Sequence, residues 1–414
     1  MREERANRAP AESADQPLGE SGKARVLIGR DICPTGRNGP LFRDGNATSL
    51  FGDQLPHFVA ADLVVVNLEC PLIAETTPIL KVGAVLSADR CSIWGIKAAG
   101  IHAVNLANNH ILDHGASGLM STIAACEAEG IARFGAGPGG CQPAPHPRDQ
   151  RTQVSLLGGC GARVQRRWSG PAGSEPLGHP GLRAHDAVSV HDVRLPGRPG
   201  PRWLRGLSLS ESEPTTDCRF MVEEGASAVV CQHSHCAGCY ERYNGAPVVY
   251  GQGNLLFDSG SCRTGSWTEG FLLGLTFEKG TETRIDLIPY VQSGEQPGAQ
   301  QVTGDRRDKL LSAIQARNDQ IRDGDFVRRQ WREWCQEHRY EYFGRIRNYG
   351  RLLRFLNKRF HFSDYIPTRK FWARLLNTVQ CESHREVLET VLEQELPSTG
   401  PRRLSSSSLG RSER

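Results

Sequence analysis

Two histidines separated by one residue give the clearest chemical signal in this sequence. His233 and His235 follow a short apolar run, Ala228 to Val230, that predicts a buried strand. An extended segment points alternate side chains to one side, so the two imidazoles can share a metal ion. A plain turn with two incidental histidines explains the stretch equally well when it is taken by itself, because short motifs are weak evidence.

Three earlier apolar strands also end in side chains that bind metals. Such groups follow the strands predicted near 24–31, 61–68 and 103–107: Asp31, then Glu69, then Asn109 with His110. Independent turns are not expected to collect such groups at every strand end. The strands alternate with helical segments, which predicts a mainly parallel sheet covered by helices, with its ligands at the carboxyl ends of the strands.

The candidate ligands mix carboxylate, amide and imidazole groups: Asp31, Glu69, Asn109, His233 and His235. This donor set suits Mn, Fe or Zn better than Ca. Two such ions held close together can activate a water molecule and clamp a phosphoryl oxygen. His110 would then be placed to protonate a leaving group as a general acid.

Four ordered motifs together resemble the bacterial capsule-synthesis family, the CapA-like poly-γ-glutamate proteins. They are Gly29-Arg30-Asp31, residues 61–72, residues 105–113, and His233-Ser-His235 with residues 243–258. The resemblance covers about residues 24 to 290. It implies a calcineurin-like metallophosphoesterase fold, an α/β layered sheet flanked by helices, with the five ligands at metal-site positions and His110 beside them.

Two departures from the family pattern stand close to these motifs. Arg30 occupies a position where a small residue is usual before the aspartate. The histidine pair is framed by Cys231, Gln232 and Cys236 rather than by the more usual Gly-His-His-Pro-His.

The resemblance implies a dinuclear metal-dependent hydrolase or transferase that acts in assembly or release of an anionic extracellular polymer, such as poly-γ-glutamate, or on its phosphorylated precursor. Capsule-assembly proteins are the implied partners. Two alternatives stay open. One is a catalytically impaired binding protein of the same fold. The other is an interaction module stabilised by a structural zinc ion, with ligands from the cluster Cys231, His233, His235, Cys236 and Cys239.

Composition narrows the class of protein. The chain has 414 residues, 38% hydrophobic and 23% charged, and a net charge of +4. This composition predicts a hydrophobic core of ordinary size. The small net charge gives no reason to expect a specific nucleic-acid partner. We find no apolar run approaching the roughly 18 residues of a membrane span and no signal-peptide core, so we predict a cytoplasmic protein whose 13 cysteines are thiols or ligands.

The predicted organisation has a metallophosphoesterase-like domain over 24–297 and a helical extension over 298–396, between disordered tails at 1–23 and 397–414. The extension interleaves aromatic residues with arginines. Such a surface can bind an acidic polymer, nucleic acid or an anionic membrane surface. A hairpin that packs its aromatics on the core is favoured, because arginine stems readily cover apolar surface.

Residues 140–214 have an atypical composition. They contain no Lys, Asn, Ile, Phe, Tyr or Met, which are residue types with A/T-rich codons. A GC-rich gene read out of frame between two compensating shifts explains this, and a diverged Pro/Gly linker is the alternative. The family's His-Gly ligand motif is missing here, with His191-Asp192 the nearest approach. We predict that the segment is poorly ordered and that activity is weakened.

Overall fold

The computed structural model describes residues 23–80, 84–136, 155–160, 187–192, 213–223, 225–232, 234–260, 263–278, 280–346, 350–361 and 375. The chain divides into two compact units near Trp331, and residues 79–82 group with the second unit. His233, both tails and most of 140–214 lie outside the described residues.

The first unit is built on a mixed eight-stranded sheet with β1 (Lys23–Cys33) in its middle. The strand order is β15-β14-β13-β1-β2-β5-β6, and β12 pairs with the end of β1. The other strands are β2 (Leu63–Leu68), β5 (Ala103–Asn105), β6 (Ala132–Phe134), β12 (Leu256–Phe257), β13 (Glu269–Glu278), β14 (Arg284–Gln292) and β15 (Ala299–Gln301). β1, β2, β5 and β6 are parallel to one another, as the alternation of strands and helices predicts.

The antiparallel part of this sheet differs from the sequence expectation. The alternating pattern of residues 271–277 and 283–290 predicts an antiparallel pair at the sheet edge, but β13 lies beside β1 and the edge strand is β15. The reason lies in the residues of β13, which are almost continuously buried from Gly270 to Leu275. A strand that is apolar on both faces gains most from an interior position.

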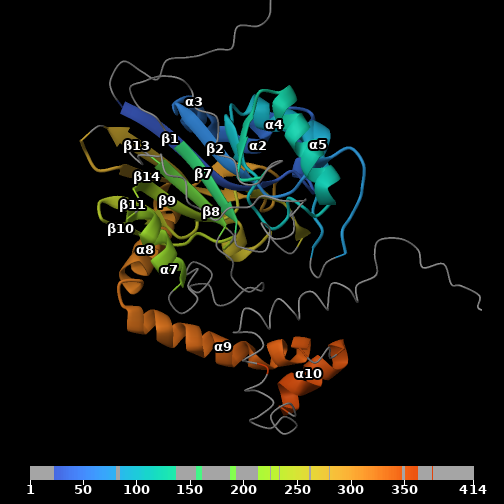
Figure 1. The fold of residues 1–414 in the computed structure, drawn as a ribbon, viewed down its shortest axis with the longest axis vertical. Coiled ribbons are helices and arrows are strands. Elements are labelled where there is room, and N and C mark those ends of the chain that lie inside the picture. Colours follow the sequence, from blue (N-terminus) through green and yellow to red (C-terminus); the bar gives the residue numbers. More distant parts are fainter. Residues whose placement is uncertain are drawn as a thin grey trace, which may run out of the picture. The chain divides into compact units, whose positions relative to one another are not determined.

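One face of the sheet is covered by the helices between β1 and β6 (Figure 1). These are α1 (Asn38–Arg43), α2 (Ala47–Phe51), α3 (Leu55–Val59), α4 (Ile93–Ala98) and α5 (Gly115–Ala128). Leu27 and Val64 of the strands share a core cluster with Phe42, Ile96 and other helix residues. Gly130, with φ of 64°, ends the α5 segment in the left-handed conformation that the sequence predicts for a helix C-cap.

The other face packs on a second sheet, which includes the strand that precedes His235. Its order is β10-β11-β9-β8-β7. The strands are β7 (Ser155–Cys160), β8 (Ala187–Asp192), β9 (Ala226–Gln232), β10 (Tyr240–Tyr243) and β11 (Ala246–Val249). Val26 and Ile28 of β1 share a core with Ala228 and Val230 of β9. His235 therefore approaches the carboxylates from a facing sheet and not from a neighbouring strand.

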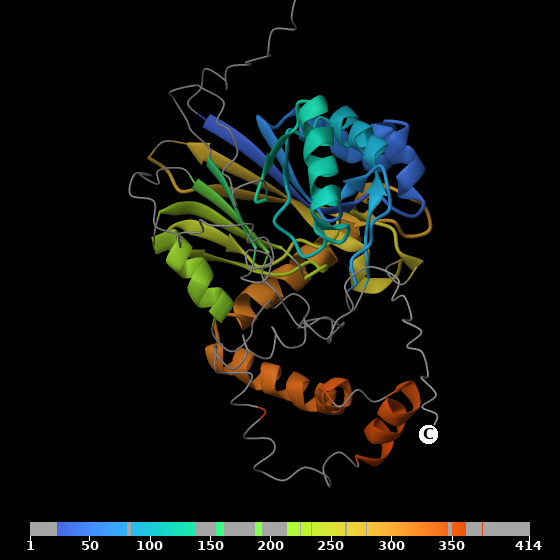
Figure 2. The ribbon, with the colours of Figure 1, turned by 45° about the vertical axis from the view of Figure 1, so that its right-hand side comes forward.

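Helix α7 (Glu213–Glu223) closes the outer face of the second sheet (Figure 2). Val229 and Cys231 alternate with the residues that face β1, and they pack against Cys218 and Val222 of this helix. The first unit thus has four layers, in the order helices, sheet, sheet, helices. This layered α/β arrangement confirms the predicted fold class.

Three further helices follow the sheets: α8 (Gly304–Gln320), α9 (Gly324–Ile346) and α10 (Arg351–Phe360). Helix α8 belongs to the first unit, since Ile314 is buried in the core between the sheets. Helix α9 begins in the first unit and continues in the second. Among the described residues, no helix is long and apolar enough to cross a membrane.

The atypical segment contributes two described strands, β7 and β8. Both pair in parallel, and β8 pairs with β9 so that His191 lies opposite Cys231 and Asp192 opposite Gln232. The backbone thus brings this His-Asp pair to the end of β9 that leads to the histidines. The predicted poor order of the remainder falls outside the described residues.

Candidate metal centre

Asp31, Glu69 and His235 converge at the carboxyl ends of the strands. One ligand atom from each lies within 4.8 Å of the others, and both carboxylates are buried. β1 shifts its register on β2 between Ile28 and Asp31, and this irregularity places Asp31 opposite Asn67. The carboxyl ends of parallel strands meet at one edge of a sheet, so local strand pairing brings the two carboxylates together.

Asn67 links the two carboxylates. Its side-chain amide donates to Asp31 Oδ1 at 2.8 Å and to Glu69 Oε2 at 2.6 Å. The amides of Asn105 and Asn108 donate in turn to Asn67 Oδ1, at 3.2 and 3.4 Å. A row of buried amides therefore fixes the orientation of both acids, as outer partners of metal ligands commonly do.

His235 is held from several sides in a backbone conformation that is unusual for its type. Its φ of 51° lies in the left-handed region, where residues other than glycine are uncommon and where strain collects at functional sites. Nδ1 lies 2.7 Å from Asn254 Oδ1 and 3.0 Å from Asp31 Oδ2. The ring stacks on Trp267 with centroids 5.0 Å apart.

Asp31 is ionised in this setting. Burial raises the pKa of its carboxyl, but the charge of Arg30 and hydrogen bonds from His235 and Asn67 lower it by more. The pKa of Asp31 therefore lies well below its ordinary value. A carboxylate that stays charged while buried is suited to bind a cation.

His110 and Asp113 form a second polar pair, linked to Asn67 through Asn108, which accepts from the His110 backbone N–H and donates to Asn67. His110 Nδ1 lies 2.6 Å from Asp113 Oδ2, and the backbone N–H of Leu86 donates to the same oxygen at 2.7 Å. The i,i+3 spacing of the two residues is the sequence signal for this pair. Asp113 orients the imidazole through one nitrogen, as a general acid requires.

The other two predicted ligands are Asn109 and His233. Asn109 is partly buried, and its side-chain oxygen is buried with no hydrogen-bond partner among the described residues. A metal-ligand oxygen has this character, since buried polar atoms are normally paired. His233 lies outside the described residues. The converging donor set of two carboxylates and an imidazole fits a divalent transition metal.

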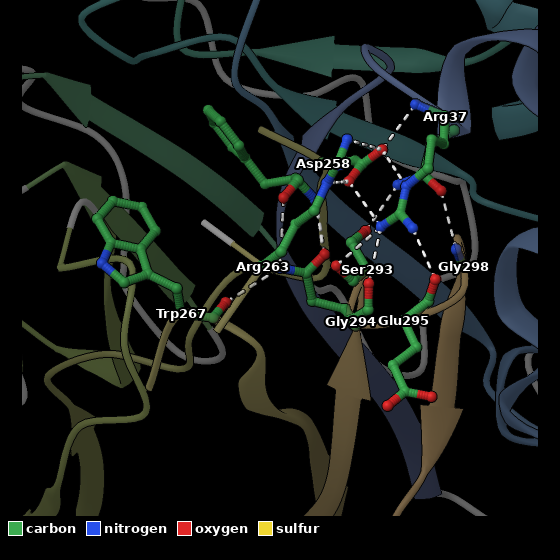
Figure 3. Close-up of polar contacts among 11 residues, drawn as sticks. Arg37, Asp258, Arg263, Trp267, Ser293, Gly294, Glu295 and Gly298 are labelled. Carbon is green, nitrogen blue, oxygen red and sulfur yellow. Dashed lines mark hydrogen bonds and ion pairs between the residues drawn. The ribbon is translucent and has the colours of Figure 1, made fainter. Parts of the chain in front are cut away.

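Asp258, at the end of the last sequence motif, serves the structure around the site. Arg37 donates to it through its backbone N–H at 2.6 Å and through Nε and Nη2 at 2.9 Å (Figure 3). Arg263 Nε donates to the same carboxylate at 2.7 Å. Burial raises the pKa of Asp258, but these bonds outweigh it and the pKa is lowered.

The guanidinium of Arg37 also donates to the carbonyls of Ser293, Gly294 and Glu295, drawn together in Figure 3. The Arg37-Asp258-Arg263 group therefore ties the loop after β1 to the loop after β14. It also anchors the chain just before η4 (Gly265–Trp267), whose Trp267 packs on His235.

Of the cluster considered for a structural zinc site, Cys231, His235, Cys236 and Cys239 belong to the described residues and His233 does not. Cys231 and Cys218 are buried with their Sγ atoms 3.3 Å apart, and this contact and burial raise the pKa of the Cys231 thiol far above its ordinary value. Burial raises the pKa of Cys239 to about 12. In the described part of the chain, the metal-type group comprises Asp31, Glu69 and His235 and includes none of these thiols.

Comparison with known proteins agrees with these motifs. Residues 25–153 and 210–259 match the family "Bacterial capsule synthesis protein PGA_cap". These two stretches make the chain similar to the bacterial capsule-synthesis family. The unmatched interval from 154 to 209 lies within the segment of atypical composition.

Similar curated proteins carry capsule or polymer names. The chain is 26% identical over 262 residues to the capsule biosynthesis protein CapA of Bacillus anthracis, covering 58% of this chain and 60% of that protein. It is 25% identical to the PGA biosynthesis protein CapA of Bacillus subtilis, covering 67% and 72%. A probable polyglutamine synthesis accessory protein of Mycobacterium tuberculosis is 26% identical, covering 48% and 56%.

Solved structures give more distant similarities. A hypothetical protein from Thermus thermophilus is 18% identical with a TM-score of 0.41, covering 64% of this chain and 99% of that one. The NAD nucleotidase of Haemophilus influenzae is 13% identical with a TM-score of 0.35, covering 71% and 56%. The similarity to the capsule-synthesis family rests on the sequence match alone.

Proposed function

We propose that this capsule-synthesis family protein is a metal-dependent hydrolase or transferase of the phosphoesterase type. The observation that carries the proposal is the convergence of Asp31, Glu69 and His235 within 4.8 Å at the carboxyl end of the sheet. A Mn, Fe or Zn ion held there would supply Lewis acidity and lower the pKa of a bound water.

The chain's own residues have distinct parts in this chemistry. Asn67 keeps both carboxylates turned toward the same point, since one amide nitrogen bonds to each of them. Asn254 and Trp267 fix the imidazole of His235 against Asp31. His110, oriented by Asp113, holds the proton that a leaving oxygen requires.

The substrate class follows from the family and the names of the relatives. Those relatives are named for capsule, PGA and polyglutamine synthesis. We therefore propose an anionic polymer of the poly-γ-glutamate type, or its phosphorylated precursor, as the substrate. Proteins of capsule assembly are the proposed partners.

Hydrolysis of an aryl phosphate in the presence of Mn²⁺ tests the reaction type. We expect turnover by the intact chain and a loss of at least a hundredfold in Glu69→Gln, with metal content measured on the same samples. Glu127→Gln is the matched control, because Glu127 is an exposed residue of α5 that pairs with Arg133 and not with the cluster. Equal activity in wild type and Glu69→Gln contradicts the proposal.

A binding protein of the same fold with impaired catalysis is the second candidate. The observation that favours it is the unmatched interval 154–209, where the resemblance calls for a further His-Gly ligand motif. Such a protein retains poly-γ-glutamate at equilibrium without changing its chain length. Binding of a fluorescent polymer, followed by gel analysis of its length, separates the two candidates.

A further inference from the structure

Arg30 is a fully buried arginine directly beside the metal cluster. It is among the largest fully buried side chains of the described residues, and its Nε lies 3.7 Å from Asp31 Oδ2. Burying a permanent charge costs several kcal/mol unless it is compensated by an opposite charge and by hydrogen bonds. A cation in this position is therefore part of the charge balance of the site.

Hydrogen bonds join this guanidinium to the last residue of β9 and to the loop that follows it. Nε donates to Gln232 Oε1 at 2.9 Å and Nη1 donates to Ser234 Oγ at 3.0 Å. Ser234 comes this close because Gly251, with φ of 156°, has no Cβ to collide with its hydroxyl. Arg30 thus stands between the two sheets, on the side from which His235 approaches.

The charges of the described groups favour one divalent ion. Asp31 and Glu69 contribute −2 and Arg30 contributes +1, so the buried cluster has a net charge of −1 before any ion binds. One divalent cation changes this to +1, and two change it to +3. A buried excess of three positive charges is strongly unfavourable without further anions.

The contacts of Asp31 also favour a single divalent ion. A carboxylate that bridges two metal ions directs one oxygen to each. Oδ1 of Asp31 already accepts from Asn67, and Oδ2 faces both His235 Nδ1 and Arg30 Nε. The guanidinium therefore already places a positive charge next to Oδ2, the oxygen that faces His235.

We propose that Arg30 is the fixed second cation of this centre, and that the chain binds one divalent ion between Asp31, Glu69 and His235. This proposal rests on the metal site of the proposed function and specifies its stoichiometry. It replaces the pair of ions that the sequence motifs imply. Arg30 Nη2 is buried without a hydrogen-bond partner among the described residues, so one donor of the fixed cation remains for an oxygen ligand.

Manganese stoichiometry tests the proposal without reference to catalysis. The intact chain is saturated with Mn²⁺, freed of excess ion, and measured by elemental analysis and electron paramagnetic resonance. We expect one Mn²⁺ per chain with the six-line spectrum of an isolated ion. Arg30→Lys, which keeps the charge, is expected to bind one ion. Arg30→Met, which keeps the length but removes the charge, is expected to bind a second.

The outcomes separate the stoichiometry from the metal site itself. Two coupled ions in the wild-type chain overturn the role of Arg30 and leave the proposed function standing. No bound metal in the wild type overturns the metal site, and the stoichiometry with it. A folded Arg30→Met that still binds one ion shows that Arg30 does not set the number.

Arg133→Met serves as the control for loss of an arginine, since Arg133 pairs with Glu127 away from the cluster. Its stoichiometry is expected to equal that of the wild type. Circular dichroism shows whether Arg30→Met is folded. If it is unfolded, the numbers of Mn²⁺ ions bound by the wild type and by Arg30→Lys still test the proposal. One ion in each supports the proposal, and two in either overturns it.

Discussion

The two sides of the metal centre are held by different means. Asp31 and Glu69 come from β1 and β2 of one sheet, where strand register and a row of asparagine amides set their positions. His235 comes from the loop after β9 of the facing sheet, where side-chain contacts and a left-handed backbone hold it. The carboxylate side therefore depends on backbone pairing, and the histidine side depends on contacts that single substitutions can remove.

Removal of a ligand from the carboxylate side is expected to have the largest effect. Glu69→Gln keeps the volume of the side chain but removes a charge that faces the cation. We expect metal affinity to fall by roughly a hundredfold or more, measured by titration calorimetry with Mn²⁺. Unchanged affinity in this variant, with Glu127→Gln as reference, would place the ion elsewhere.

His110→Ala tests whether the neighbouring imidazole acts on protons or binds metal. In the proposed mechanism the metal stays and turnover falls by about a hundredfold. Asp113→Asn is expected to cause a smaller fall, because the imidazole remains but loses its charged partner. Loss of metal together with activity in His110→Ala would make His110 a ligand.

Asn67→Ala and Asn254→Ala compare the supports of the two sides directly. Asn67 contacts both carboxylates, whereas Asn254 contacts the histidine alone. Outer partners of metal ligands contribute about 10- to 100-fold in affinity, so we expect Asn67→Ala near the upper value and Asn254→Ala near the lower. The reverse order, measured with Mn²⁺, would show that the histidine loop is the more critical support.

Asp258→Asn is expected to affect stability more than metal affinity. The variant weakens the bonds to Arg37 and Arg263, and we expect a loss of about 2 kcal/mol in free energy of unfolding near pH 7. The pKa of Asp258 is lowered in the folded state, so its stabilisation is present above the unfolded pKa and is lost as the pH falls through the folded pKa.

Denaturant unfolding at several pH values measures this difference. The gap between wild type and Asp258→Asn should be widest near neutral pH and should narrow below about pH 4, the ordinary range of an aspartate. A gap that widens in acid would mean that another group, and not Asp258, carries the pH dependence.

The parallel strands and the polar groups at their ends can be predicted from local sequence patterns. Short apolar runs followed by Asp31, Glu69 or Asn109 are local patterns, and parallel strands bring their carboxyl ends to one edge whatever the details of packing. The similarity to the capsule-synthesis family follows from the same motifs, because four of them occur in order.

The packing of the second sheet on the first, and the groups that it brings to the site, follow from long-range contacts. Arg30 meets Gln232 and Ser234 across 202 and 204 residues, and Arg37 meets Asp258 across 221. Whether a charged side chain is buried or exposed depends on the distant partners that compensate its burial, and local sequence does not specify these partners. For this reason Arg30 is only a departure from a pattern in the sequence, but a buried cation beside Asp31 in the fold.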